Sequence, residues 1–351
     1  MKASSRIALA FVLIGLAIIA VQLARLTSRV ADLDARLNAL EEAKAPPNET
    51  RTQDEEPTKG SGSPDGSVHR TAEAKAEGKG TEQAPPPART EEQLQTFRGS
   101  ISKKGLCGAF EKLGKKGDVI CAHVARVLRW RLDLRRDLRK GDRIAVVYGW
   151  LRDENEPVVE AIGVEGKVRV RAYRFRAGGD PYASYFDEQG MEIPARLVNS
   201  PIDGYEQITA FFGDRRGRKR HLGIDFKAPV GTPVRSPFDG VVVRKNWNWR
   251  NNGNCIEIKV DGEEMYAIFL HLDKLKVGAG DRVKKGDVIA ASGNTGRTTA
   301  PHLHYQLDRV VRGRRKPIDP LKYHRLYRKK LEGEELDRFR ARAKELQTLM
   351  R

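Results

Sequence analysis

Residues 301–307 read PHLHYQL, and this short stretch indicates both a local structure and a chemistry. In an extended strand, successive side chains point to opposite faces. His302 and His304 would therefore share one face, and the apolar Leu303, Tyr305 and Leu307 would share the other. An apolar face opposite a His-x-His face suits a sheet with a hydrophobic core on one side and a metal ion on the other.

Two further segments place metal-binding side chains on extended chain. The sequence HLGID runs from His221 to Asp225, and the glycines and prolines in and after it disfavour a helix. In an extended segment His221 and Asp225 fall on one face, with Gly223 leaving room between them. Residues 267–272 read AIFLHL and place His271 at the end of an apolar strand run. Imidazole and carboxylate are both zinc ligands, and four of the seven histidines belong to these three patterns.

Together these motifs resemble the LytM/lysostaphin-type zinc peptidases, which cleave peptide cross-links in bacterial peptidoglycan. GTPV at 231–234, DGVV at 239–242 and VKKGDVIA at 283–290 also fit that family, and the resemblance covers about 205–325. More loosely, LDLRRDLRKGDR at 132–143 and YFDEQG at 185–190 resemble the accessory domain of envelope-anchored, MepM-like murein endopeptidases.

The resemblance implies a role for each of five residues and leaves the substrate-binding residues unidentified. His221, Asp225 and His304 would hold Zn²⁺, while His271 and His302 would act beside it as catalytic residues. Three protein ligands with an open fourth position are the catalytic arrangement of zinc. One of the two catalytic histidines would move a proton and the other would stabilise the oxyanion, in an order that the sequence leaves open. The implied function is a zinc-dependent endopeptidase that hydrolyses peptidoglycan cross-links during cell-wall remodelling.

Two other function classes compete with this interpretation. A non-catalytic wall-binding activator of an amidase would resemble the same domain but lack the metal ligands, and here all five positions are present. A nucleic-acid binder would account for the net charge of +18, since residues 1–95 carry −2 and residues 96–351 carry +20. That class requires a cytosolic body and readout elements that we do not find in the sequence, so nucleic acid is not an expected partner. The carboxylates of peptidoglycan stem peptides would attract the same basic surface.

The N-terminal segment predicts attachment to a membrane. Residues 7–23 are apolar apart from Gln22, and Lys2 and Arg6 precede them, which favours a cytoplasmic N-terminus. A cleaved signal peptide is the alternative. In the segment that follows, Leu and Val recur at alternating spacings of three and four residues. This spacing predicts either a short coiled coil, and with it a homodimer, or a single amphipathic helix. The expected location is the inner (cytoplasmic) membrane, single-pass, with the catalytic domain in the periplasm or cell envelope.

The middle of the chain predicts a small α+β module. Two short helices are expected around the Gly-Lys-Lys-Gly sequence at 114–117, followed by strands. Cys107 and Cys121 fall one in each predicted helix, where a disulfide and two unpaired buried thiols are both consistent with the pattern. His123 is interpreted as structural and His324 as a surface residue. An amphipathic C-terminal helix is expected to pack back on the body.

The predicted fold class is a mainly β catalytic domain, with an antiparallel lysostaphin-like sheet, a small α+β accessory domain and an N-terminal transmembrane helix. The expected organisation is 1–6 cytoplasmic N-terminus, 7–24 transmembrane anchor, 25–43 short coiled coil, 44–95 disordered linker, 96–200 accessory α+β domain, 201–325 zinc metallopeptidase domain and 326–351 C-terminal helix.

Overall fold

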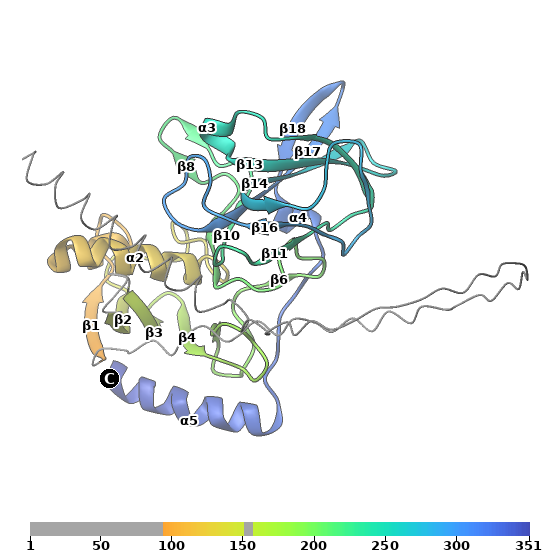
Figure 1. Cartoon of the computed structure of the whole chain (residues 1–351). Coiled ribbons are helices and arrows are strands. Elements are labelled where there is room, and N and C mark those ends of the chain that lie inside the picture. The colour runs from red at the N-terminus through yellow and green to blue at the C-terminus, as the bar shows by residue number, and fades with distance from the viewer. Residues whose placement is uncertain (1–93, 151–156) are drawn as a thin grey trace, which may run out of the picture. The chain divides into compact units, whose positions relative to one another are not determined.

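A computed structural model describes residues 94–150 and 157–351, which form two large antiparallel sheets (Figure 1). The predicted anchor at 7–24, the predicted coiled coil at 25–43 and nearly all of the predicted linker lie outside these residues. Of the helices that are described, none combines the length and the apolar character needed to cross a membrane.

The first sheet has five strands, which follow one another in sequence order. They are β1 (Gln95–Ser100), β2 (Arg143–Trp150), β3 (Pro157–Glu165), β4 (Arg169–Phe175) and β5 (Ser184–Phe186). Helix α2 (Gly114–Leu128) packs on one face of this sheet and helix α5 (Gly333–Met350) on the other, as Figure 1 shows. Because both faces of β3 are covered, this strand is an almost continuous apolar run instead of an alternating one.

The expectation of two helices around Gly-Lys-Lys-Gly is wrong, because these residues form the first turn of α2. Two short 3₁₀ turns precede it, η1 (Cys107–Ala109) and η2 (Glu111–Leu113). Gly117 is needed for packing, since a Cβ there would lie 2.2 Å from the main-chain oxygen of Phe110. Of the two alternatives for the cysteines, the structure has the disulfide, which joins Cys107 to Cys121.

The second sheet has ten strands and surrounds the largest apolar core. Its strands are β7 (Gln207–Ala210), β10 (Ile224–Lys227), β11 (Pro233–Arg235), β12 (Gly240–Lys245), β13 (Asn254–Val260), β14 (Met265–Leu275), β15 (Arg282–Val283), β16 (Val288–Ser292), β17 (His302–Val311) and β18 (Arg314–Ile318). The predicted alternation along β17 is confirmed, because Leu303, Tyr305 and Leu307 are fully buried in this core. The mainly β, antiparallel character expected of this region is therefore present.

Shorter elements connect and border the sheets. They are β6 (Arg196–Leu197), which pairs with β19 (Leu326–Tyr327), the hairpin of β8 (Arg215–Arg216) and β9 (Lys219–Arg220), and the single-turn helices α3 (Trp249–Asn252) and α4 (Pro320–Tyr323). The C-terminal helix packs on the body as expected, with Phe339, Leu346 and Met350 buried. It begins at Gly333 and not at 326, because residues 326 and 327 are used as a strand.

Side chains from both sheet regions meet after the end of α2. The indole of Trp130 contacts both apolar cores, and its ring centroid lies 5.4 Å from that of Phe211. The guanidinium of Arg129 lies 4.2 Å from the same Phe211 ring centroid and forms an ion pair of 2.8 Å with Asp214. The helical module is thus packed against the segment that leads into β10.

Candidate metal centre

Three of the five predicted site residues are brought together by the pairing of β10 with β17. In this antiparallel pair Asp225 lies directly opposite His304. His221 comes three residues before β10 and lies on the same side of the chain as Asp225. All three side chains are buried, and buried polar groups need partners that compensate for the loss of water.

The donor atoms of these residues converge on one point. His221 Nε2 lies 3.0 Å from His304 Nδ1 and 3.1 Å from Asp225 Oδ1, and His304 Nδ1 lies 2.8 Å from Asp225 Oδ1. A tetrahedral ion with ligand bonds of about 2.0–2.1 Å separates its ligand atoms by about 3.4 Å, so an outward movement of a few tenths of an ångström would accommodate it. Two imidazoles and one carboxylate are a donor set that fits a divalent metal ion.

The surrounding main chain orients the His221 ring and leaves space for the site. His221 Nδ1 donates a hydrogen bond to the main-chain oxygen of Phe211 at 3.0 Å, which leaves the Nε2 lone pair facing the other two donors. A Cβ on Gly223 would lie 2.3 Å from the main-chain oxygen of Tyr305 and 3.0 Å from the ring of His304. The expectation that Gly223 leaves room is therefore confirmed, and the reason is the close approach of β17.

Asp225 is held in its ionised form. Burial raises the pKa of this carboxyl, but the neighbouring His221 and His304 side chains outweigh burial and hold the pKa well below its ordinary value. On the other carboxylate oxygen, Asp225 Oδ2 accepts a hydrogen bond of 2.5 Å from Arg216 on the β8–β9 hairpin. The basic segment before His221 thus reaches the candidate metal centre through Arg216.

His271 and His302 lie side by side next to this centre, with their ring centroids 4.7 Å apart. His271 Nδ1 donates to the main-chain oxygen of Thr295 at 2.9 Å, and His302 Nδ1 donates to that of Ala300 at 2.8 Å. In the neutral form of each ring, this arrangement leaves Nε2 as the unprotonated nitrogen. His302 Nε2 lies 3.9 Å from Asp225 Oδ1.

The backbone at His271 departs from that of a regular strand. This residue has a φ of 63°, a left-handed value that is uncommon for a non-glycine residue and recurs at functional sites. The pairing of β13 with β14 is also irregular between Phe269 and Leu272, the stretch that contains His271. Burial and the nearby His302 lower the pKa of His271 to about 4. The ring is therefore neutral at physiological pH.

The polar face of β17 continues beyond the histidines, which the sequence patterns did not reveal. His304 Nε2 lies 3.4 Å from Gln306 Oε1, and Gln306 Nε2 donates to Asp308 Oδ1 at 2.7 Å. Across the sheet, the buried Glu257 accepts hydrogen bonds from Arg244 and Arg315. The alternation of β17 could have predicted this, because every second residue lies on the same face of a strand. The residues on that face are His302, His304, Gln306 and Asp308.

The interpretation of His324 as a surface residue is wrong. This side chain is buried, and its Nε2 lies 2.9 Å from the hydroxyl of Tyr305. Its ring also stacks on Phe238, with centroids 5.4 Å apart, and burial lowers its pKa to about 4. His123 Nε2 lies 2.8 Å from the hydroxyl of Tyr185, within the helical module and away from the metal centre, as expected for a structural residue.

Comparison with known proteins finds similarity over the same region. Residues 219–320 match the sequence profile of Peptidase family M23. The chain is 34% identical over 239 residues to Peptidoglycan DD-endopeptidase ShyA of Vibrio cholerae, covering 65% of this chain and 53% of the relative. It is 33% identical over 197 residues to Peptidoglycan DD-endopeptidase ShyC of the same organism, covering 52% and 43%. The chain thus spans about half the length of these curated relatives.

A solved structure described as a zinc containing peptidase from Vibrio cholerae is also similar. It is 28% identical, the match covers 64% of this chain and 70% of that chain, and the TM-score is 0.31.

Proposed function

We propose that this chain, whose residues 219–320 form a domain of peptidase family M23, is a zinc-dependent endopeptidase. Its proposed reaction is the hydrolysis of peptide cross-links of peptidoglycan in cell-wall remodelling. The observation that carries the proposal is the convergence of His221, Asp225 and His304, with two further histidines beside them. Two curated relatives named as peptidoglycan DD-endopeptidases support the substrate class.

His221, Asp225 and His304 would hold the zinc ion. Zinc bound by three protein ligands supplies Lewis-acid polarisation of a carbonyl and a more acidic water at its open position. His302 and His271 present Nε2 atoms beside that centre, because their Nδ1 atoms are engaged with main-chain oxygens. One of them would accept a proton and deliver it to the leaving amine, and the other, when it carries a proton, would donate a hydrogen bond to the developing oxyanion.

The chemistry of the donors favours a catalytic ion over a structural one. Structural zinc sites are usually closed by four ligands and are rich in cysteine. Among the described residues, the three-donor group contains no cysteine, and Cys255, the cysteine outside the disulfide, is a buried strand residue elsewhere in the same domain. A non-catalytic activator of an amidase would have no need of this donor set, so the alternative function is the less favoured one.

Digestion of purified peptidoglycan tests the proposal directly. The full chain should release soluble fragments, a chelator should stop the release, and added zinc should restore it. Mass analysis of the fragments should show a newly freed amine and carboxylate at a peptide cross-link, with glycan strands intact. Two results would contradict the proposal. One is the release of amidase-type fragments, and the other is full digestion by chelator-treated protein whose measured metal content is zero.

The proposed location and assembly rest on the sequence alone. We propose a single-pass anchor at 7–24 in the inner membrane, a linker at 44–95 that separates the anchor from the body, and an accessory domain and peptidase domain on the periplasmic side. The supporting observation is the apolar segment preceded by Lys2 and Arg6. Protease accessibility of fractionated membranes tests the orientation, and cross-linking of the full chain tests the homodimer proposed for the coil at 25–43.

A further inference from the structure

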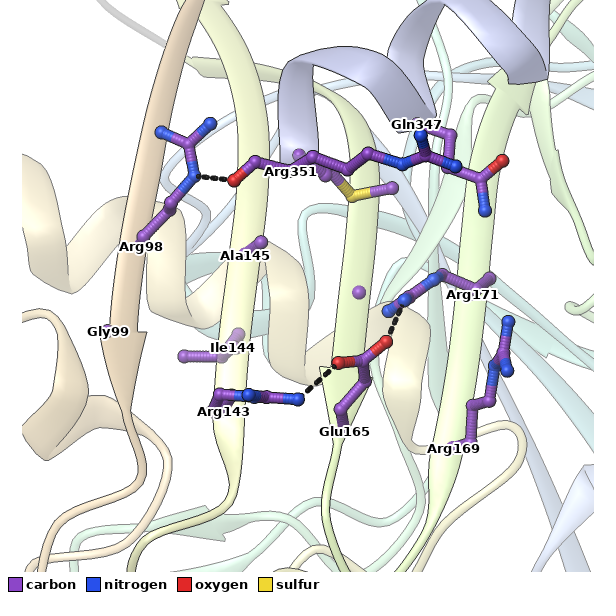
Figure 2. Close-up of a pocket in the computed structure, with 12 residues that line it drawn as sticks. Arg98, Gly99, Arg143, Ile144, Ala145, Glu165, Arg169, Arg171, Gln347 and Arg351 are labelled. Atoms are coloured by element: carbon purple, nitrogen blue, oxygen red, sulfur yellow. Dashed lines mark hydrogen bonds and ion pairs between the residues drawn. The ribbon is translucent and has the colours of Figure 1, made fainter.

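A hollow of about 500 Å³ lies on one face of the five-stranded sheet, beside the end of α5 (Figure 2). Its floor crosses four strands in register, since Arg98 pairs with Ala145, Ala145 with Gly163, and Gly163 with Arg171. Gln347, Met350 and Arg351 form the wall on the side of α5. No residue of the candidate metal centre lines this hollow, so it is a separate feature of the molecule.

The hollow exists because the two central floor positions carry almost no side chain. A Cβ on Gly163 would lie 2.6 Å from Arg171 Nη1 and 3.3 Å from Met350 Sδ. The absence of that Cβ leaves room for the Arg171 side chain, which points from β4 toward β3 in Figure 2. The short side chain of Ala145, at the neighbouring floor position, occupies little of the hollow. Larger residues at these two positions would fill the space that α5 leaves uncovered.

The lining is strongly basic. Five arginines and a single acid, Glu165, line the hollow, which attracts anions. The lining arginines have few acidic partners. Glu165 is shared, since it accepts from both Arg143 and Arg171, and Arg169 lies 3.6 Å from Glu188, which is outside the lining. The buried Nε–H of Arg171 has no hydrogen-bond partner.

We propose that this hollow binds a carboxylate of an acidic peptide, and that the peptide is the stem peptide of peptidoglycan. The identity of the peptide rests on the proposed function, whereas the carboxylate chemistry does not. Arg143 and Arg171 already hold one carboxylate, that of Glu165, each through one Nη2 atom.

The wall formed by α5 favours a peptide over a phosphate group. Gln347 offers both a neutral donor and a neutral acceptor, which suit a peptide bond. Arg98 donates to the main-chain oxygens of Leu349 at 2.8 Å and Arg351 at 3.0 Å, so oxygens at the C-terminal end of α5 lie at the edge. These oxygens carry partial negative charge, which opposes a doubly charged phosphate more than a singly charged carboxylate. The accessory module would thus hold the polymer at a second point, away from the metal centre.

Binding of soluble stem tetrapeptides from peptidoglycan to the full chain tests the proposal, with chelator present so that no hydrolysis intervenes. The double variant Arg143→Gln/Arg169→Gln removes two exposed arginines of the hollow and should weaken binding at least about tenfold at low salt. The matched control is Arg338→Gln/Arg340→Gln, which removes the same charge from exposed positions of α5 outside the hollow. The control should bind like the parent.

A third variant separates shape from charge. Ala145→Met fills the floor and keeps every arginine, so it should also weaken tetrapeptide binding at least about tenfold, provided that its thermal unfolding matches that of the parent. Peptides with amidated carboxyl groups should bind weakly to the parent. The proposal is overturned if Ala145→Met binds normally, if the control pair loses as much affinity as the hollow pair, or if amidated peptides bind equally well.

Two further probes identify the ligand class. Inorganic phosphate and vesicles of anionic phospholipid should compete poorly, and strong competition by either would overturn the assignment to a peptide. Failure of this proposal is distinguishable from failure of the proposed function, because the latter is read from digestion with the metal present. If an unrelated acidic peptide binds as well as the tetrapeptide, the carboxylate site stands and the assignment to the stem peptide fails.

Discussion

The five-stranded and the ten-stranded sheets use their faces differently. The first sheet lies between two helices, and its apolar side chains point to both faces. The second encloses its core on one face of β17, while the other face of that strand carries polar side chains at every second position from His302 to Asp308. A sheet covered on both faces gains stability from burial. A sheet with a row of partly buried polar groups needs partners for them, and a bound metal ion and a substrate can supply those partners.

The comparison predicts that the largest effects on activity come from the polar face of β17. His304→Ala removes a proposed ligand and should abolish both bound zinc and peptidoglycan digestion. His302→Ala should keep zinc and lower the digestion rate by about 10²–10⁴-fold, because it removes a group proposed to act beside the ion. Metal analysis together with fragment release measures both, and a fully active variant of either kind would refute the site.

Phe339→Ala should produce the largest loss of stability in the five-stranded region. The Phe339 ring lies among Phe175, Phe186 and Tyr173, at centroid distances of 5.5, 5.8 and 6.2 Å, and is almost fully buried. Its removal should cost about 3–5 kcal/mol of unfolding free energy, measured by denaturant titration. Leu349→Ala, at an exposed position of the same helix, is the control and should change little. Equal losses for the two variants would show that α5 is not anchored as described.

Reduction of the disulfide should have a somewhat smaller effect in the same region. The bridge joins Cys107 and Cys121 across a sequence separation of 14 residues. Loop-closure entropy for a loop of this length predicts a loss of about 3 kcal/mol in a Cys107→Ser/Cys121→Ser variant. Zinc content of the folded variant should be unchanged, because the metal centre lies in the other sheet. A parallel loss of zinc from protein that is still folded would show that the two regions are more tightly coupled.

The smallest predicted effect tests the contact between the two regions. Asp214 accepts from Arg129 and from the main-chain nitrogen of Phe211, whose oxygen in turn accepts from the His221 ring. Asp214→Asn should weaken zinc binding by about tenfold, the lower end for groups that orient a ligand. Asp261→Asn, which alters a comparable surface pair with Arg282, is the control. Competition with a chelator of known affinity measures both, and equal zinc affinities would argue against this orienting chain.

Much of the β-rich half could be predicted because its signals are local. The alternation in residues 301–307 and the glycine and proline pattern after His221 depend only on strand geometry and backbone sterics. The structure brings His221, Asp225 and His304 together, and Gly223 has the spatial role expected of it. The apolar pattern of residues 336–350 likewise predicted a helix that packs on the body.

Other features could not be predicted because they depend on what packs against them. Gly117 is expected from the sequence to lie between two helices, whereas it lies within one helix, against the main chain of Phe110. His324 is interpreted from the sequence as a surface residue, yet it is buried against Tyr305. The left-handed backbone of His271 coincides with a register shift between β13 and β14, and the basic hollow lies where Ala145 pairs with Gly163.

The sequence by itself determined which residues carry metal-binding chemistry and which face of each strand they occupy, since both follow from residue type and from a period of two. Only the tertiary structure decided which faces meet. The pairing of β10 with β17, and the closure of α2 and α5 over the five-stranded sheet, join residues that are far apart in the chain. Such long-range pairings are selected by the burial of the whole core, and no local pattern encodes them.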